Sequence, residues 1–316
     1  MKTIPYKKGL HKLTDKIYTW LEPPGSWGLN NAGLIFNKGK SLLIDTLYDL
    51  KYTAEMKKEI TAVIGDRDPD QILVTHANGD HFYGCQLFPG SEVIASRLCA
   101  KEMLELPPGK MAMFQKLYRM LGKAGKYFHR EFGKFDFRGI KAVKPGKTFQ
   151  GESVIDAGGL EVRVKDLGPM HTKSDSIVWV PSEKTVFAGD LLFIEGTPIC
   201  WEGHIENAVK ALDYIADLKA EYIVPGHGPL TDSNGVAGVR DYFKYVYSEA
   251  EECFMKGMDY YEAAKSINLD IFSSLHFPER IVINVASFYR QFDKKMSKPG
   301  PVKLFALMQK YIEEKK

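Results

Sequence analysis

The sequence contains no apolar run that approaches the ~20 residues a membrane-spanning helix requires. Basic residues near the N-terminus are not followed by the apolar stretch of a secretory signal peptide. The cysteines Cys85, Cys99, Cys200 and Cys253 are scattered and form no CxxC pair, which argues against a disulfide framework or a structural zinc ribbon. We therefore expect a reduced, cytoplasmic protein.

The chain also lacks a strong excess of charge of either sign. Its formal net charge is +3 over 316 residues, so the composition gives no reason to expect a nucleic acid or a membrane surface as partner. Hydrophobic residues make up 44% and charged residues 26%, which is the ordinary balance of a globular protein with a sizeable core. The partner that we expect is a small-molecule substrate.

Short apolar runs of strand length alternate with loops and helices over roughly the first two hundred residues. Residues 52–64 and 205–218 carry apolar side chains at helical spacing. TWLEPPGSWGLNN (19–31) is predicted to be a loop whose Trp20 and Trp27 either border a pocket or pack in the core. The runs with a strand pattern are NAGLIF (31–36), SLLIDT (41–46), QILVT (71–75), EVIAS (92–96), LEVRVKD (160–166), SIVWV (176–180), TVFAGD (185–190) and YIVPG (222–226). This alternation predicts an α/β fold.

Two regions depart from this rhythm. Residues 97–135 are rich in Met, Lys and aromatic residues and are predicted to be an insert of helices. The insert is an amphipathic helix with a solvated basic face, a mobile lid over an apolar substrate, or an oligomer interface, and these roles can overlap. From 233 onward only helical periodicity is found. We therefore expect a main domain over 1–232 and a helical extension over 233–316, with a homo-oligomer formed through the insert or the C-terminal helices.

Side chains that bind metals follow the ends of several predicted strands. They are, in chain order, His76, Asn78, Asp80, His81, His171, Asp190 and His227. Because loops at strand ends are held by a rigid sheet, we expect these side chains to converge. Imidazole nitrogens and carboxylate oxygens suit zinc, iron or manganese, and a catalytic site leaves one position open for water. The remaining histidines, His11, His129, His204 and His276, are expected to be structural or surface residues.

The segment THANGDH (75–81) resembles the THxHxDH motif of the metallo-β-lactamase superfamily. Four further segments match that family's pattern in the same order: LIDT (43–46), GPMHT (168–172), FAGD (187–190) and PGHG (225–228). Together the five segments span about residues 30–230. The resemblance implies a four-layer αββα sandwich, here with a helical insert and a helical C-terminal extension, and a metal-dependent hydrolase.

The resemblance also implies a role for each candidate. Carried over position by position, it makes His76 and His171 ligands of a first metal ion, Asp80, His81 and His227 ligands of a second, and Asp190 a bridge between them. Asp45 matches an aspartate that hydrogen-bonds a ligand from behind. Asp80 is in addition the candidate proton acceptor in catalysis. The implied cofactor is one or two Zn²⁺ ions, with iron or manganese as alternatives.

One position departs from the common pattern. The family's second histidine is Asn78 here, and the chain resembles a branch with HxNGDH in place of HxHxDH. An amide oxygen is a harder and weaker donor than imidazole toward zinc, so the first site is expected to be the weaker one, or to suit iron or manganese better. An Asn beside a Gly is also common in turns that bind no metal, and both interpretations of Asn78 stay open.

The reaction implied is hydrolysis, in which a metal-held hydroxide attacks an electrophilic centre. The expected substrate is a small organic ester, lactone, thioester or amide, and fold analogy does not choose among them. Two other classes stay open: an iron-dependent oxidoreductase on the same fold, and a non-catalytic metal-binding or sensor protein.

Overall fold

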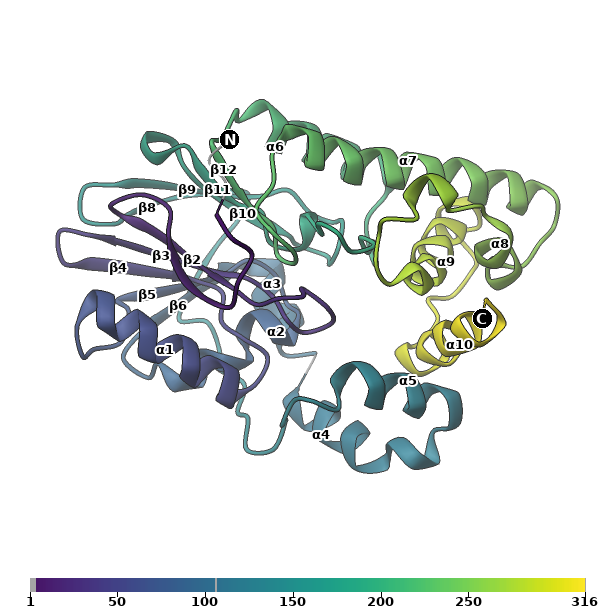
Figure 1. Cartoon of the computed structure of the whole chain (residues 1–316), viewed down its shortest axis with the longest axis horizontal. Helices are drawn as coiled ribbons and strands as arrows, with labels where there is room; N and C mark the ends of the chain where they lie inside the picture. The colour runs from purple at the N-terminus through teal and green to yellow at the C-terminus, as the bar shows by residue number, and fades with distance from the viewer. Residues whose placement is uncertain (1–3, 106, 316) are drawn as a thin grey trace.

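The computed structural model describes residues 4–105 and 107–315 of the chain. In this part of the chain two β-sheets lie face to face (Figure 1). Helix α1 (Leu50–Ile64) covers the outer side of one sheet, and α6 (Ile205–Asp217) and α7 (Ser233–Met255) cover the outer side of the other. This arrangement confirms the αββα sandwich that the resemblance implies.

Both sheets mix parallel and antiparallel pairs. The first has the strand order β1 (Gly9–Lys12), β2 (Ile17–Leu21), β3 (Ala32–Asn37), β4 (Lys40–Ile44), β5 (Gln71–Val74), β6 (Glu92–Ser96) and β7 (Lys147–Phe149). The second has the order β12 (Tyr222–Val224), β11 (Thr185–Phe187), β10 (Ser176–Val180), β9 (Glu161–Asp166) and β8 (Glu152–Asp156). The pairs β4–β5, β5–β6 and β11–β12 are parallel. Their carboxyl ends therefore open toward the same edge of each sheet.

The alternation of side chains along each strand explains the layers. In β4, Leu42 and Ile44 pack in the core between the sheets, whereas Leu43 packs in the core under α1. In β10, Val178 faces the other sheet and Ile177 faces the layer of α6 and α7. Strands buried on both faces are apolar at successive positions, as the sequence of β5 predicts.

The remaining helices are short or belong to the insert and the extension. They are α2 (Gly79–Phe82), α3 (Arg97–Met103), α4 (Pro108–Leu117), α5 (Gly122–Phe132), α8 (Tyr260–Ser266), α9 (Ile281–Phe292) and α10 (Pro301–Glu314), with the 3₁₀ segments η1 (Tyr83–Leu87), η2 (Tyr118–Met120), η3 (Pro181–Glu183), η4 (Gly189–Leu191), η5 (Asp270–Phe272) and η6 (Pro278–Arg280). Among the described residues, no helix is both long and apolar enough to cross a membrane.

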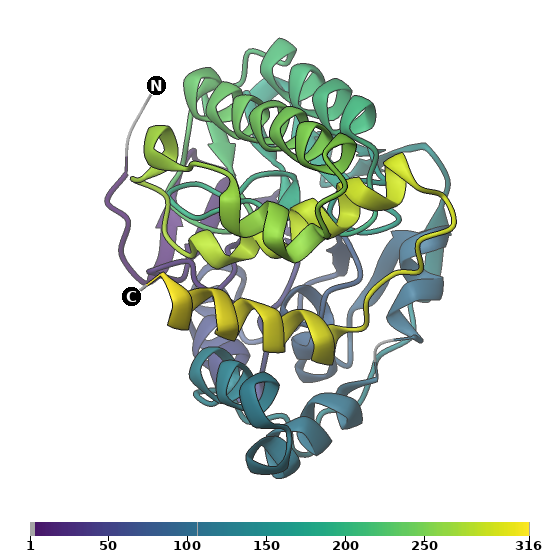
Figure 2. The same ribbon diagram turned by 90° about the vertical axis from the view of Figure 1, so that its right-hand side faces the viewer.

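The insert and the C-terminal extension pack against each other, with α5 and α10 side by side in both views (Figures 1 and 2). Tyr127 and Phe132 of α5 contact Phe305 of α10, at ring-centroid distances of 5.5 and 5.8 Å. On the solvent side, Lys123 donates to Glu313. Helix α5 therefore has one face buried against the C-terminal helices and one basic, solvated face.

The expectation for residues 19–31 was wrong at its start. Trp20 lies in β2 and is 2% exposed, and its Nε1 donates to Glu22 Oε2. The run IYTWL hides its strand period because four of its five side chains are buried. The strands β1, β7 and β8 were not expected either, since these sheet-edge strands are short and carry many exposed polar residues.

Gly84 marks the close contact of η1 with α1. A Cβ at this position would lie 2.2 Å from Thr53 Oγ1, and that hydroxyl is held by a hydrogen bond to Asp49 O. We expect Gly84→Ala to lower the free energy of unfolding by about 1–3 kcal/mol through overpacking. Gly238→Ala is the matched control: Gly238 lies in α7 with open space around it, and alanine there should raise stability by up to about 1 kcal/mol. Equal urea midpoints for the two variants would contradict this.

Candidate metal centre

The side chains singled out in the sequence converge at the carboxyl ends of β5, β9, β11 and β12. They form two groups whose ligand atoms lie within 4.8 Å of one another: His76, His171 and Asp190 in the first, and Asp80, His81 and His227 in the second. His76 follows β5, Asp190 lies in η4 after β11, and His227 follows β12. None of His11, His129, His204 and His276 belongs to either group of described residues.

Asp190 stands between the two groups. Its Oδ2 lies 3.2 Å from His171 Nε2 and 3.6 Å from His76 Nε2. The same oxygen lies 3.4 Å from His227 Nε2, and Oδ1 lies 3.1 Å from His81 Nε2. The backbone beside it is closely packed, since a Cβ on Gly226 would lie 2.0 Å from Asp190 Oδ1. One carboxylate therefore faces four imidazoles at once.

Each imidazole is held by its other nitrogen. The contacts are His76 Nδ1 to Thr75 Oγ1 (3.0 Å), His81 Nδ1 to Asp45 Oδ2 (2.8 Å), His171 Nδ1 to Ile199 O (2.9 Å) and His227 Nδ1 to Leu29 O (3.1 Å). A carbonyl or carboxylate can only accept, so Nδ1 carries the proton wherever it meets one. In a neutral ring, Nε2 is then left with a lone pair that faces Asp190. This is the arrangement in which histidine binds a metal.

Asp45 orients two of these rings. It is buried, and it takes a backbone φ of +61°, a left-handed conformation that Asp tolerates better than most residues. Its Oδ2 accepts from His81 Nδ1 and from Thr75 Oγ1, and its Oδ1 accepts from Thr75 N. Because the Thr75 hydroxyl donates to Asp45, it accepts from His76. A single carboxylate thus sets the tautomer of one histidine in each group.

Burial and opposing charges shift the pKa values at the centre in different directions. Burial, together with the imidazole of His81, lowers the pKa of His76 well below its usual value. Burial also acts to lower the pKa of His81, but the carboxylates of Asp190 and Asp45 outweigh it and raise that pKa well above normal. Burial alone would raise the pKa of Asp190, yet the imidazoles of His227 and His81 hold it well below its usual value.

The residues present fit a metal cation. His76 Nε2, His81 Nε2 and Asp190 Oδ1 are buried and have no hydrogen-bond partner among the described residues. Burying polar atoms without a partner is costly, so their convergence calls for a group that binds all of them. Imidazole and carboxylate are the donors of zinc, iron and manganese sites.

Asn78 faces the first group. Its Nδ2 lies 2.8 Å from His171 Nε2, whereas its side chain makes no capping hydrogen bond to the described backbone of α2. This contact places the Asn78 side chain beside the first group, and its role as a metal ligand stays a prediction.

Aromatic rings lie around the centre. Phe193 stacks on His227 with a centroid distance of 5.0 Å and meets His171 at 5.4 Å. Tyr48 and Tyr83 stack on each other at 5.7 Å. Phe193 is missed because an aromatic in an apolar run is usually core, and nothing in its local sequence distinguishes a ring beside a metal site from one that is not.

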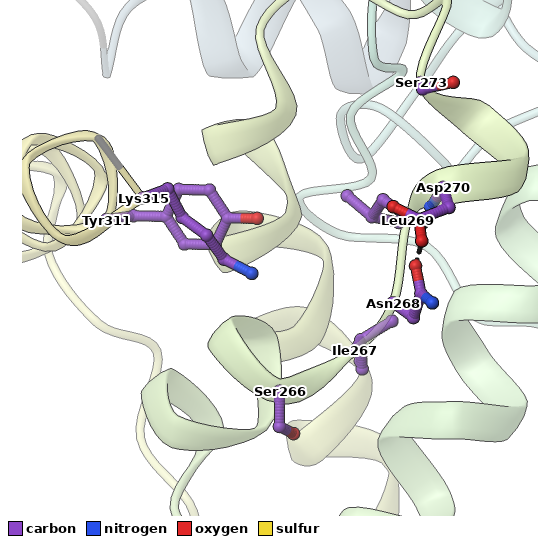
Figure 3. A pocket seen from close by; sticks show the side chains of 8 residues that line it. All are labelled: Ser266, Ile267, Asn268, Leu269, Asp270, Ser273, Tyr311 and Lys315. Carbon is purple, nitrogen blue, oxygen red and sulfur yellow. Dashed lines mark hydrogen bonds between the residues drawn. The ribbon is translucent and has the colours of Figure 1, made fainter.

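A separate surface hollow is lined by residues of the C-terminal extension. It has a volume of about 430 Å³ and lies between the end of α8 with η5 and the end of α10 (Figure 3). Tyr311 and Lys315 face Leu269 and Asn268 across it. The described residues that line it bring one carboxylate, Asp270, and no imidazole, so the hollow does not share the chemistry of the metal centre.

Comparison with known proteins agrees with this geometry. The family model of the metallo-beta-lactamase superfamily matches residues 25–227, which include both groups of side chains. A related protein from Caenorhabditis elegans, described as a Beta-lactamase-like protein 2 homolog, is 24% identical over 237 residues. That match covers 73% of this chain and 68% of the relative.

Solved structures share the fold at lower identity. The stereoselective inverting sec-alkylsulfatase Pisa1 from Pseudomonas sp. superposes with a TM-score of 0.66 at 15% identity over 94% of this chain, which spans about half (52%) of that enzyme. A metallo-beta-lactamase from Pontibacter korlensis gives a TM-score of 0.54 at 18% identity, over 75% of this chain and 98% of its own. The likeness to Pisa1 thus extends into the C-terminal helices. From the family match and the fold together, the chain belongs to the metallo-β-lactamase superfamily of metal-dependent hydrolases.

Proposed function

We propose that the chain hydrolyses a small organic ester, lactone, thioester or amide at a centre of one or two zinc ions. The observation that carries the proposal is the set of four buried imidazoles, each anchored through Nδ1, whose Nε2 atoms face Asp190. His76, His171 and Asp190, with Asn78 beside them, would hold a first ion. Asp80, His81 and His227 would hold a second, and Asp190 faces both groups.

Each side chain has a part in the reaction. When bound, the cations lower the pKa of water to about 7 and stabilise negative charge on the substrate oxygen. Asp45 and Thr75 keep two rings in the required tautomer. Asp80 accepts the proton that the attacking water loses. Of the three carboxylates it is the most accessible to water, since Asp80 is 8% exposed whereas Asp45 and Asp190 are 3% exposed. The aromatic rings around the centre exclude water and favour a small, largely apolar substrate.

Iron or manganese would suit the same donors, and an iron-dependent oxidoreductase or a non-catalytic metal sensor would use the same residues. A cytoplasmic location is supported by Cys85, Cys99, Cys200 and Cys253 being buried free thiols. A homo-oligomer through the insert is supported by exposed apolar side chains there, Met113 at 54% and Met120 at 82%. We propose no nucleic acid or membrane partner.

The test is metal analysis combined with an activity panel. Protein purified without added metal should contain zinc and be colourless, and it should hydrolyse at least one of a neutral ester, a lactone, a thioester, an amide or a sulfate ester. A chelator should abolish that activity, and zinc should restore it. The sulfate ester is included because of the fold shared with Pisa1. Iron with visible absorbance would favour the oxidoreductase, and no turnover at full metal loading would contradict hydrolysis.

A further inference from the structure

A buried guanidinium lies one aromatic ring away from the metal centre. Arg280, at the end of η6, is 0% exposed. Its Cζ lies 4.5 Å from the ring centroid of Trp27, 4.6 Å from that of Phe277 and 5.6 Å from that of Phe193. Phe193 is the ring that stacks on His227. The guanidinium of Arg280, from the helical extension, therefore lies next to the catalytic centre.

The hydrogen bonds of this guanidinium leave one edge free. Nη1 donates to Thr197 O at 3.2 Å, which fixes the orientation of the group. Nε and Nη2 are buried and have no hydrogen-bond partner among the described residues. These two nitrogens share one edge of the guanidinium, from which two N–H bonds project in parallel. That edge matches the two oxygens of an oxyanion, which it binds in bidentate fashion.

The acidic groups around Arg280 balance its charge without occupying that edge. The carboxylates that act on it are those of Glu279, Glu131 and Asp190, with the hydroxyl of Tyr127. Glu279 Oε1 accepts from Tyr127 Oη at 3.1 Å and lies 3.5 Å from Arg130 Nη2. Glu131 Oε1 accepts from Arg130 Nε at 2.6 Å.

Asp190 belongs to the metal centre, so every one of these carboxylates is engaged elsewhere. Burial lowers the pKa of Arg280 from its usual value, but a guanidinium stays protonated in proteins.

The indole ring of Trp27 packs on the guanidinium of Arg280. The Trp27 side chain is half-buried, and its Nε1 donates to Tyr127 Oη at 2.9 Å. Its ring also lies 6.5 Å from that of Trp201, whose backbone N donates to His171 O. Trp27 therefore links the guanidinium of Arg280 to the side of the centre where His171 lies.

We propose that the Nε–Nη2 edge of Arg280 binds an oxyanion group of the substrate, in the planar geometry of a carboxylate. The inference rests on the proposed hydrolase and narrows its substrate class to small organic acids that carry an ester, lactone, thioester or amide bond. The cation fixes one end of the molecule, and the metal centre acts on the bond at the other end. Arg280 is thus a specificity-determining residue contributed by the C-terminal extension.

Two esters with the same leaving group test this: p-nitrophenyl butyrate, with a neutral acyl chain, and mono-p-nitrophenyl glutarate, whose acyl chain ends in a carboxylate. Arg280→Gln removes both the positive charge and the pair of parallel N–H donors, whereas Arg280→Lys keeps the positive charge but lacks the paired donors. Both variants should lower kcat/KM for the glutarate ester by about tenfold or more. The butyrate ester, which carries no carboxylate, should lose kcat/KM by a smaller factor, so that the ratio of kcat/KM for the glutarate ester to that for the butyrate ester falls by about tenfold. The p-nitrophenyl ester of 4-sulfobutyrate distinguishes a sulfonate from a carboxylate, and the carboxylate is expected to be preferred.

Glutarate binding to the metal-loaded protein, measured by calorimetry, separates this inference from the proposed function. If neither ester is hydrolysed but glutarate binds and Arg280→Lys weakens it, the hydrolase proposal fails and the anion site stands. The matched control is Arg240→Gln in α7, where Arg240 pairs with Asp213 on the surface. Equal losses for both esters, or glutarate binding unchanged in Arg280→Lys, would overturn the proposal. Arg280→Lys carries the test if Arg280→Gln does not fold.

Discussion

Asp190→Asn is expected to release both metal ions and to lower kcat by more than about 100-fold, beyond the 10–100-fold cost of losing a residue that only supports a ligand. Asp190 has an oxygen within 3.6 Å of the Nε2 atoms of His76, His81, His171 and His227. The amide keeps the volume of the carboxylate but removes its charge. It also turns an NH₂ group toward lone pairs that must bind a cation. Neither group of ligands is complete after that change.

Metal content and kcat measured on the same preparation check this prediction. The control is Asp49→Asn, at another buried aspartate. Asp49 caps α1 by accepting from Tyr52 N and also accepts from Asp136 N. Asn is a good helix cap, so this control should lose some stability and keep its metal and its activity. Two equivalents of zinc retained in Asp190→Asn would mean that the carboxylate does not bridge the groups.

Much of this centre could be predicted from the sequence because its ligands follow strands with a strong local signal. QILVT and YIVPG are apolar runs that end at His76 and His227, and the ends of neighbouring strands meet at one sheet edge. Asp190 follows the same logic at the end of β11. The hydrophobic pattern predicts where each strand lies, and the end of the strand determines where the residue that follows it lies.

The parts of the site and of the fold that the sequence did not predict depend on contacts between residues far apart in the chain, which no local pattern contains. Arg280 and Phe193 lie in segments that look helical or apolar in sequence, and they meet only because η6 packs against the loop that follows η4. Trp27 meets Tyr127 across 100 positions of the chain. A strand such as β2, buried on both faces, loses its alternation and is indistinguishable from an apolar loop.

Asn78→His is expected to tighten the first metal site on the order of 100-fold. Structural zinc sites with four ligands bind with about 10–16 kcal/mol, or several kcal/mol per ligand, and each 1.4 kcal/mol is a factor of ten. Asn78 is half-buried, its backbone is extended (φ −93°, ψ 140°), and its Nδ2 already lies 2.8 Å from His171 Nε2. An imidazole at this position therefore reaches the first group without a change of backbone.

The same geometry predicts which of the two sites binds metal more tightly in the unaltered protein. Under the proposed assignment, Asp80, His81 and His227 would give a second ion three strong donors besides Asp190, whereas a first ion would have His76 and His171 with only the amide of Asn78 as third donor. A competing zinc chelator should therefore remove the first ion before the second. Because His171→Ala deletes a first-site ligand, it should abolish the weaker step of the titration and leave the tighter one.

In Asn78→His the two steps of the chelator titration should occur at more similar chelator concentrations, since both sites then have three strong donors besides Asp190. Asn234→His, on the exposed first turn of α7, controls for adding an imidazole anywhere on the protein and should leave both steps in place. If His171→Ala instead loses the tighter step and keeps the weaker one, the assignment of the weak site is wrong. If Asn78→His leaves both affinities unchanged, the amide does not face the metal, and the departure from the HxHxDH pattern has to be explained by the turn into α2 instead.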